Sequence, residues 1–136
     1  MEIEIFSLSD YAVDNNGKLS VIGTFDTIFT HQVPTIHPSF YVAVKFRVAN
    51  SEAGQHEFQI RGLTPDGKEI ATIKAIGEVR PNANTGYSST NIVVPFYNMK
   101  MDKLGKYCFE FYYDGEFRSG LSLHLVQLPI ELNKAA

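Results

Sequence analysis

Carboxylates, a phenol and imidazoles near the start of the chain are the best candidates for groups that contact a ligand. Two acids, a tyrosine and two histidines fall within or beside the loops that separate the first predicted strands. If those strands pair as a hairpin, the groups meet near one loop region, and loops commonly carry binding. We therefore predict a ligand-contacting end formed by Asp10, Tyr11, Asp26, His31 and His37.

The same region does not complete a metal-binding pattern. His31 and His37 lie close together, whereas His56 and His124 are distant in the sequence. A zinc site needs three or four ligands in a closed geometry. The segment 14–17, Asp-Asn-Asn-Gly, has its glycine too early for a calcium loop of the EF type and is typical of a tight turn. We predict no metal and no cofactor.

The sequence also lacks a motif that would indicate nucleophilic catalysis. Cys108 lies between Tyr107 and Phe109, which supply neither a base nor a positive charge to stabilise a thiolate. The G-x-S-x-G motif and the glycine-rich phosphate-binding motifs do not occur in the sequence. We predict that Cys108 is a half-buried strand residue and that the protein is not an enzyme.

Length and composition favour one soluble domain spanning residues 1–136. The chain has 44% hydrophobic residues and a net charge of -3, which gives no broad attraction to nucleic acid. A single cysteine excludes an intramolecular disulfide, and no apolar run approaches the roughly 18 residues of a membrane span. Because the first residues include Glu2 and Glu4 where a secretory signal needs positive charge, we expect a cytoplasmic protein without a membrane partner.

Alternation of apolar and polar residues predicts an all-β fold. The clearest runs are residues 40–48, 57–61, 107–113 and 121–126, in which every second residue is apolar. Ten Phe and seven Tyr add to the strand signal. About eight strands at turn-separated spacings predict a two-sheet antiparallel β-sandwich. The strand order remains open between Greek-key, immunoglobulin-like and jelly-roll arrangements.

Four local features carry more specific expectations. Pro95 lies in a strand-like run and predicts an edge strand or a bulge, and Gly23 predicts a bulge or a close backbone approach. Tyr107 follows a turn and is either a tyrosine corner or another core aromatic. The adjacent Val21 and Ile22 make both faces of their strand apolar, which predicts cover by a loop or by a second subunit.

Several short motifs together resemble a known family. They are residues 5–6 (IF), 10–12 (DYA), 16–19 (NGKL), 22–25 (IGTF), 37–41 (HPSFY), 65–67 (PDG) and 105–107 (GKY). The pattern is similar to a family of short, leaderless bacterial proteins classed only as a domain of unknown function. The resemblance implies one all-β domain over nearly the whole chain and implies no catalytic residue.

From these features we expect a non-enzymatic intracellular binding or protein-interaction module. Its partner would be another protein or a second copy of the chain, because edge strands and exposed aromatic residues recruit partners. The alternative is a β-sandwich that binds a carbohydrate or another small ligand, either alone or with the help of a calcium ion. Two coplanar tyrosine rings would favour that alternative.

Overall fold

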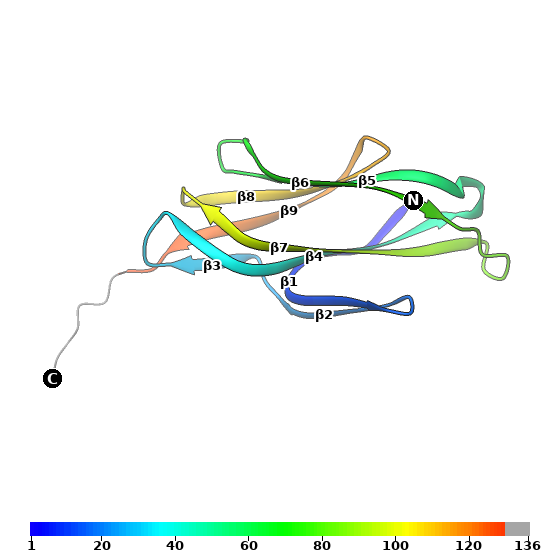
Figure 1. Cartoon of the computed structure of the whole chain (residues 1–136), viewed down its shortest axis with the longest axis horizontal. Coiled ribbons are helices and arrows are strands. Elements are labelled where there is room, and N and C mark those ends of the chain that lie inside the picture. The colour runs from blue at the N-terminus through cyan, green and yellow to red at the C-terminus, as the bar shows by residue number, and fades with distance from the viewer. Residues whose placement is uncertain (130–136) are drawn as a thin grey trace.

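The fold is described from a computed structural model over residues 1–129 of the chain. Nine strands form two facing layers, and no α-helix occurs in the described residues (Figure 1). The strands are β1 (Glu2–Asn15), β2 (Lys18–Thr24), β3 (Thr27–Thr30), β4 (Thr35–Ala49), β5 (Gly54–Leu63), β6 (Glu69–Val79), β7 (Tyr87–Met101), β8 (Gly105–Tyr113) and β9 (Glu116–Gln127), with a short 3-10 turn η1 (Asn50–Glu52) between β4 and β5. The expected all-β sandwich is confirmed, with nine strands where about eight were predicted.

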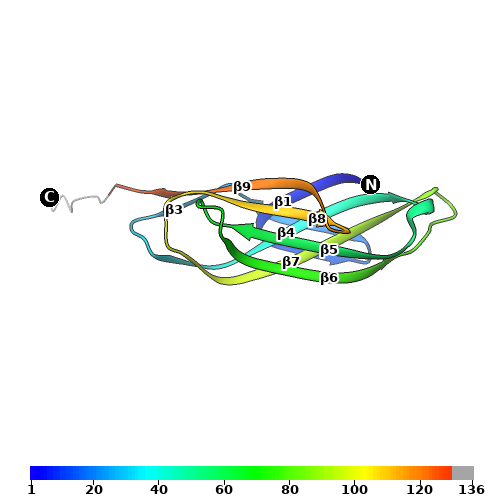
Figure 2. The same ribbon diagram turned by 90° about the horizontal axis from the view of Figure 1, so that it is seen from above.

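The two sheets have the orders β2-β1-β4-β7 and β3-β9-β8-β5-β6. Every neighbouring pair is antiparallel except β3 and β9, which run parallel from Thr27↔His124 to Thr30↔Gln127. The short strand β3 was not predicted from the sequence because its four residues show little alternation of apolar and polar side chains. Strands β1 and β9 lie along one side of the sandwich and β6 and β7 along the other (Figure 2).

The core lies between the inner faces of the two sheets. The alternating apolar residues of β4, from Phe40 to Val48, are 0% exposed, as the period of two predicts. Their rings meet those of β8: the ring centroids of Phe40 and Phe109 are 5.5 Å apart, and those of Phe46 and Phe111 are 5.7 Å apart. Burying each such ring stabilises the fold by roughly 1.5–3 kcal/mol.

Tyr107 forms a tyrosine corner. Its ring is 1% exposed, and its hydroxyl donates to the backbone oxygen of Lys103 at 2.7 Å. The backbone nitrogen of Lys103 lies 3.4 Å from the same hydroxyl, to which it donates. Burial raises the pKa of the Tyr107 hydroxyl, so the group stays a donor at neutral pH. Tyr107 is thus both a core aromatic and a link across the β7–β8 turn.

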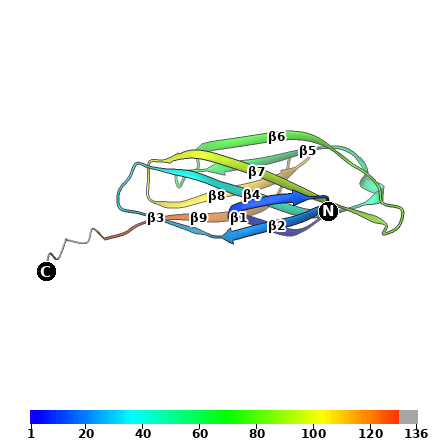
Figure 3. The same cartoon turned by 60° about the horizontal axis from the view of Figure 1, so that its bottom comes forward.

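The β1–β2 hairpin folds back across the outer face of its own sheet (Figure 3). Strand β1 pairs with β4 up to Ser9 and with β2 from Ser9 onward, so Ser9 marks the change of direction. The backbone oxygen of Gly17 at the hairpin tip accepts a bond from the side-chain amide of Asn91 on β7 at 3.1 Å. Ser9 and Ala43 are 0% exposed although they belong to this outer face. The hairpin thereby covers part of this outer face, whereas Ile22 on β2 is 60% exposed, so the described residues do not supply the cover that was predicted for that strand.

The structure shows the surroundings of Pro95 and Gly23, the two residues for which the sequence predicted an irregular strand. Strand β7, which contains Pro95, is the last strand of its sheet, so the predicted edge strand is confirmed. Gly23 has φ +71°, and a Cβ at that position would lie 2.7 Å from the Oδ2 atom of Asp10. The close neighbour of Gly23 is therefore a side-chain carboxylate of the opposite strand, and not the backbone or the bulge that the sequence predicted.

Candidate binding groove

A stretch of unpaired strand edge occurs in both sheets on the side where β1 meets β9. Strand β2 begins to pair with β1 only at Ser9, which leaves one edge of residues 2–8 without a strand partner. Strand β3 begins to pair with β9 only at His124, which leaves one edge of residues 116–123 without a strand partner. Backbone groups on such edges are free to pair with another chain.

The crossover from β2 to β3 closes one end of this opening. The backbone nitrogen of Phe25 donates to the backbone oxygen of Leu8 on β1 at 3.1 Å. One residue later, the backbone oxygen of Asp26 accepts a bond from the nitrogen of His124 on β9 at 2.7 Å. The crossover therefore ties the two sheets together, and it places Phe25 and Asp26 at the end of the opening.

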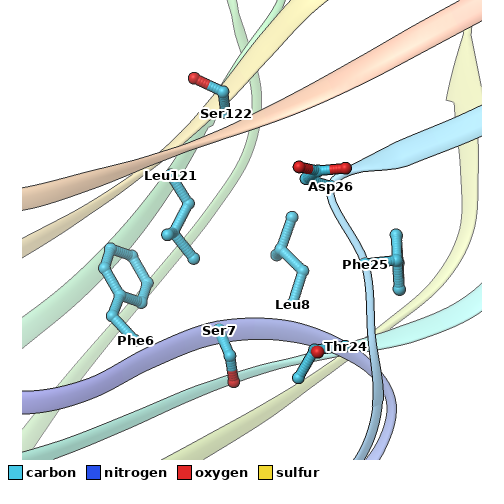
Figure 4. A pocket seen from close by; sticks show the side chains of 8 residues that line it. All are labelled: Phe6, Ser7, Leu8, Thr24, Phe25, Asp26, Leu121 and Ser122. Atoms are coloured by element: carbon cyan, nitrogen blue, oxygen red, sulfur yellow. The ribbon is translucent and has the colours of Figure 1, made fainter.

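The space between the two edges is a groove of about 460 Å³. Its lining residues are Phe6, Ser7, Leu8, Thr24, Phe25, Asp26, Leu121 and Ser122. The side chains of Phe6, Leu8 and Leu121 extend into the space between the β1 and β9 ribbons, whereas the hydroxyls of Ser7 and Ser122 point away from it (Figure 4). The walls are therefore apolar, and the carboxylate of Asp26 is the one charged group among the lining residues.

A second hollow, of about 380 Å³, shares Phe25 with the groove. It is lined by Asp10, Phe25, Thr27, Ile28, Phe29 and His37. Burial is the main influence on His37 and lowers the pKa of its imidazole, against the opposing effects of the Asp10 charge and of a backbone hydrogen bond at Ser39. His37 therefore favours its neutral form in the folded protein.

The structure brings some of the predicted site residues together and separates others. Asp10 and His37 line the second hollow, and Asp26 lines the adjoining groove. Tyr11 instead packs edge-on against Tyr41, with ring centroids 5.2 Å apart. The backbone oxygen of His31 accepts a bond from the side chain of Gln127 at 3.0 Å. The predicted end thus divides into an Asp10–Asp26–His37 region and two residues outside both hollows.

Sequence reasoning missed the apolar walls of the groove. Leu121 belongs to a predicted strand with one apolar face, and Phe6 lies beside Ile5 in a segment that is apolar on both faces, but neither residue was predicted to border a groove. Their function as groove walls depends on which edges β2 and β3 leave unpaired, and no local pattern encodes that. The nearest signal was the adjacency of Ile5 and Phe6, which makes β1 apolar on both faces.

Three observations bear on the chemistry that the sequence raised for a thiol, a metal ion and a sugar. Burial raises the pKa of the Cys108 thiol, so the thiolate is disfavoured. Within residues 1–129, no three His, Cys, Asp or Glu side chains gather in a way that could hold a metal ion. The rings of Tyr11 and Tyr41 are inclined by 70°, so this pair does not form the flat platform that would favour sugar stacking. Over the same residues, no helix has the length and apolarity needed to cross a membrane.

Comparison with known proteins shows a family and a likeness to solved structures. The profile of a family of unknown function, DUF6941, matches residues 4–126. No curated protein sequence matches the chain. Among solved structures, the chain is similar to the Pseudomonas fluorescens alkylpurine DNA glycosylase AlkC bound to DNA containing an abasic site analog, with 10% sequence identity and a TM-score of 0.49. The match covers 92% of this chain and 30% of that one.

Proposed function

Taking as a premise that this chain belongs to the DUF6941 family of unknown function, we propose that it is a non-enzymatic protein-interaction module. In this proposal, the groove between β1 and β9 receives an extended segment of another protein. The observation that carries the proposal is the coincidence of an apolar groove with unpaired strand edges on both of its sides.

An extended segment suits these edges because only another main chain offers donors and acceptors at the spacing of a strand. Strand addition to a sheet edge draws affinity from backbone hydrogen bonds and specificity from alternate side chains. Here the inward-facing side chains of the added strand would meet Phe6, Leu8 and Leu121. The volume of about 460 Å³ accommodates one or two large apolar side chains.

The negative charge of Asp26 indicates which kind of residue should flank the apolar part of the partner segment. Asp26 is exposed, and among the described residues its carboxylate accepts a hydrogen bond only from the hydroxyl of Thr27, at 2.9 Å. No described salt bridge involves Asp26. A Lys or Arg next to the apolar residues of the partner would pair with this carboxylate. The segment we propose is therefore extended and apolar, with a cation at the Asp26 end.

The non-enzymatic part of the proposal has its own support. The two serine hydroxyls of the groove point away from its interior, and Asp26 has no histidine side chain as a hydrogen-bond partner among the described residues (Figure 4). A nucleophile and a base within hydrogen-bond reach of each other are the usual signature of covalent catalysis.

The test is a comparison of captured proteins across matched variants. Tagged wild-type protein is incubated with cytosolic extract of the native host, the compartment that the sequence predicts, and bound proteins are quantified by mass spectrometry. Two groove variants, Asp26→Arg and Leu121→Asp, are compared with Ile76→Asp, which alters a 74% exposed residue on β6 along the opposite side. We expect one partner that wild type and Ile76→Asp retain, and that both groove variants lose by roughly tenfold, or about 1.4 kcal/mol.

A second step tests the extended segment directly. Overlapping synthetic peptides of the captured partner should include one that shifts the backbone amide signals of residues 6–8 and 121–122. A partner retained equally by all variants, or shifts confined to other strands, would overturn the proposal. Concentration-dependent dimerisation that Leu121→Asp abolishes would replace the foreign segment by a second copy of this chain, and sedimentation velocity measures it.

A further inference from the structure

His56 lies at the end of the sandwich that carries the β8–β9 turn, and both of its ring nitrogens face oxygen acceptors. Its Nδ1 atom is 2.6 Å from the Oδ2 atom of Asp114, in the turn between β8 and β9. Its Nε2 atom is 2.5 Å from the backbone oxygen of Glu52, in the 3-10 turn η1. The ring therefore joins three segments of the fold: its own strand β5, η1 and the β8–β9 turn.

This geometry selects the protonation state of the ring. A neutral imidazole carries one N–H and can donate from one nitrogen only, whereas the imidazolium donates from both. A backbone oxygen and an ionised carboxylate are acceptors only. Both short contacts are therefore satisfied together when His56 is protonated and Asp114 is ionised.

The acceptor on the turn is held in place independently of the ring. The other carboxylate oxygen of Asp114 accepts a bond from the backbone nitrogen of Glu57 at 2.9 Å. The backbone nitrogen of Asp114 donates to the oxygen of Glu57 at 2.8 Å. The His56 side chain is 15% exposed, so a partly desolvated ring meets a carboxylate that is already positioned.

The remaining neighbours of the ring also bear on its charge. The ring of Tyr113 on β8 stacks on that of His56, with centroids 4.8 Å apart and planes inclined by 23°. The carboxylate of Glu52 in η1 adds negative charge, although the Met1 amino group lies 3.6 Å from it. The guanidinium of Arg118 on β9 lies over the Tyr113 ring, 5.7 Å from the ring centroid. The carboxylates of Asp114 and Glu52 favour the charged ring, and neither the Met1 amino group nor Arg118 is among the groups that bear on its pKa.

We propose that protonated His56 is a pH-dependent clamp that fastens the β8–β9 turn and the 3-10 turn to strand β5, and that this end of the sandwich loosens when the ring loses its proton. The clamp does not depend on the function proposed for the groove, because its residues lie outside the groove lining.

The sign of the pH dependence follows from the two partners. The hydrogen bond to Asp114 raises the pKa of His56 above its usual 6.5, although burial opposes it, and the same bond lowers the pKa of Asp114 below its usual 3.8. The contribution of His56 to stability is therefore fully present below pH 6.5 and is lost as the pH rises through the raised folded value. The contribution of Asp114 is present above pH 3.8 and is lost as the pH falls through the lowered folded value.

The first test is an NMR titration of the imidazole signals in the native protein and in the urea-unfolded chain. We expect the native His56 to titrate at a higher pH than in the unfolded chain. We also expect the amide hydrogen exchange of Glu57 and Asp114 to quicken, beyond its ordinary base catalysis, as the pH passes that value. A native His56 that titrates at or below the unfolded value would overturn the proposal.

Two variants separate the clamp from general effects of losing a histidine. Asp114→Asn keeps the size of the side chain and removes its charge, so the titration of His56 should move down toward its unfolded value. His56→Gln should remove the added hydrogen-exchange response, whereas His124→Gln, at an exposed residue of β9, should keep it. If Asp114→Asn leaves the titration of His56 unchanged, the carboxylate is not the partner that holds the proton and the proposal is wrong.

Discussion

Two residues on neighbouring strands show how packing in the centre of the sandwich differs from packing on the side of the groove. Phe109 on β8 and Leu121 on β9 are directly paired and point to the same inner face. Phe109 is 0% exposed between the rings of Phe40 and Phe96, whereas Leu121 is half-buried and forms a wall of the groove. The difference follows from the edges: β8 has a strand on each side, and residue 121 of β9 has one on one side only.

The largest expected effect is the loss of folding stability when each member of this pair is truncated to alanine in a separate variant. Phe109→Ala should lower the free energy of unfolding by about 3–5 kcal/mol, because it leaves a cavity in a sealed core. Leu121→Ala should lower it by about 1–2 kcal/mol, less than a fully buried leucine, because the side chain already borders an open space. Urea unfolding of the two variants measures both values. Equal losses would show that the groove side is packed as tightly as the core.

Enlarging side chains tests the same contrast in the opposite direction. Leu121→Phe should change stability by less than about 1.5 kcal/mol, because the groove has room for the added atoms. Val42→Phe, at a residue that is 0% exposed, should lower stability by about 1–3 kcal/mol through overpacking. Thermal unfolding of both variants gives the comparison. A Leu121→Phe protein that is destabilised as much as Val42→Phe contradicts an open groove.

The smallest expected effect is the pH response of His37, which lines the hollow next to the groove. Because burial lowers the pKa of His37, its contribution to stability is present above pH 6.5 and is lost as the pH falls through the lowered folded value. This sign is opposite to that of His56. His37→Gln should therefore flatten the fall in melting temperature between pH 6.5 and 5, and Asp10→Asn should lower the pKa of His37 further. A melting temperature of His37→Gln that falls as steeply as that of wild type would contradict this account.

The parts of the fold that could be predicted from the sequence rest on short-range periodicity and turn chemistry. Residues 40–48 alternate in the sequence, and their apolar members are the most deeply buried in β4. Asn16 and Gly17 form the predicted tight turn with positive φ values of 52° and 84°. Pro95 predicted an edge strand because proline cannot donate to a neighbouring strand, and β7 is such a strand.

The candidate site could be predicted only in part. Asp10, Asp26 and His37 were selected for their chemistry and their nearness to loops, and they line the two hollows beside Phe25. Tyr11 was selected on the same grounds but lies outside both hollows. Its strand folds back at Ser9 and carries it to Tyr41, and that bend has no signature in the local sequence.

By itself, the sequence determined the alternating burial of its clearest strands, such as residues 40–48 and 107–113, where tight turns occur and that the layers are sheets. These properties depend on neighbours one to four positions away. Only the tertiary structure decided that β2 begins to pair with β1 at Ser9 and that β3 begins to pair with β9 at His124. Those two limits create the groove, and they depend on how strands distant in the sequence share their backbone hydrogen bonds. The same holds for His56, whose two acceptors, Glu52 and Asp114, come from separate segments of the chain.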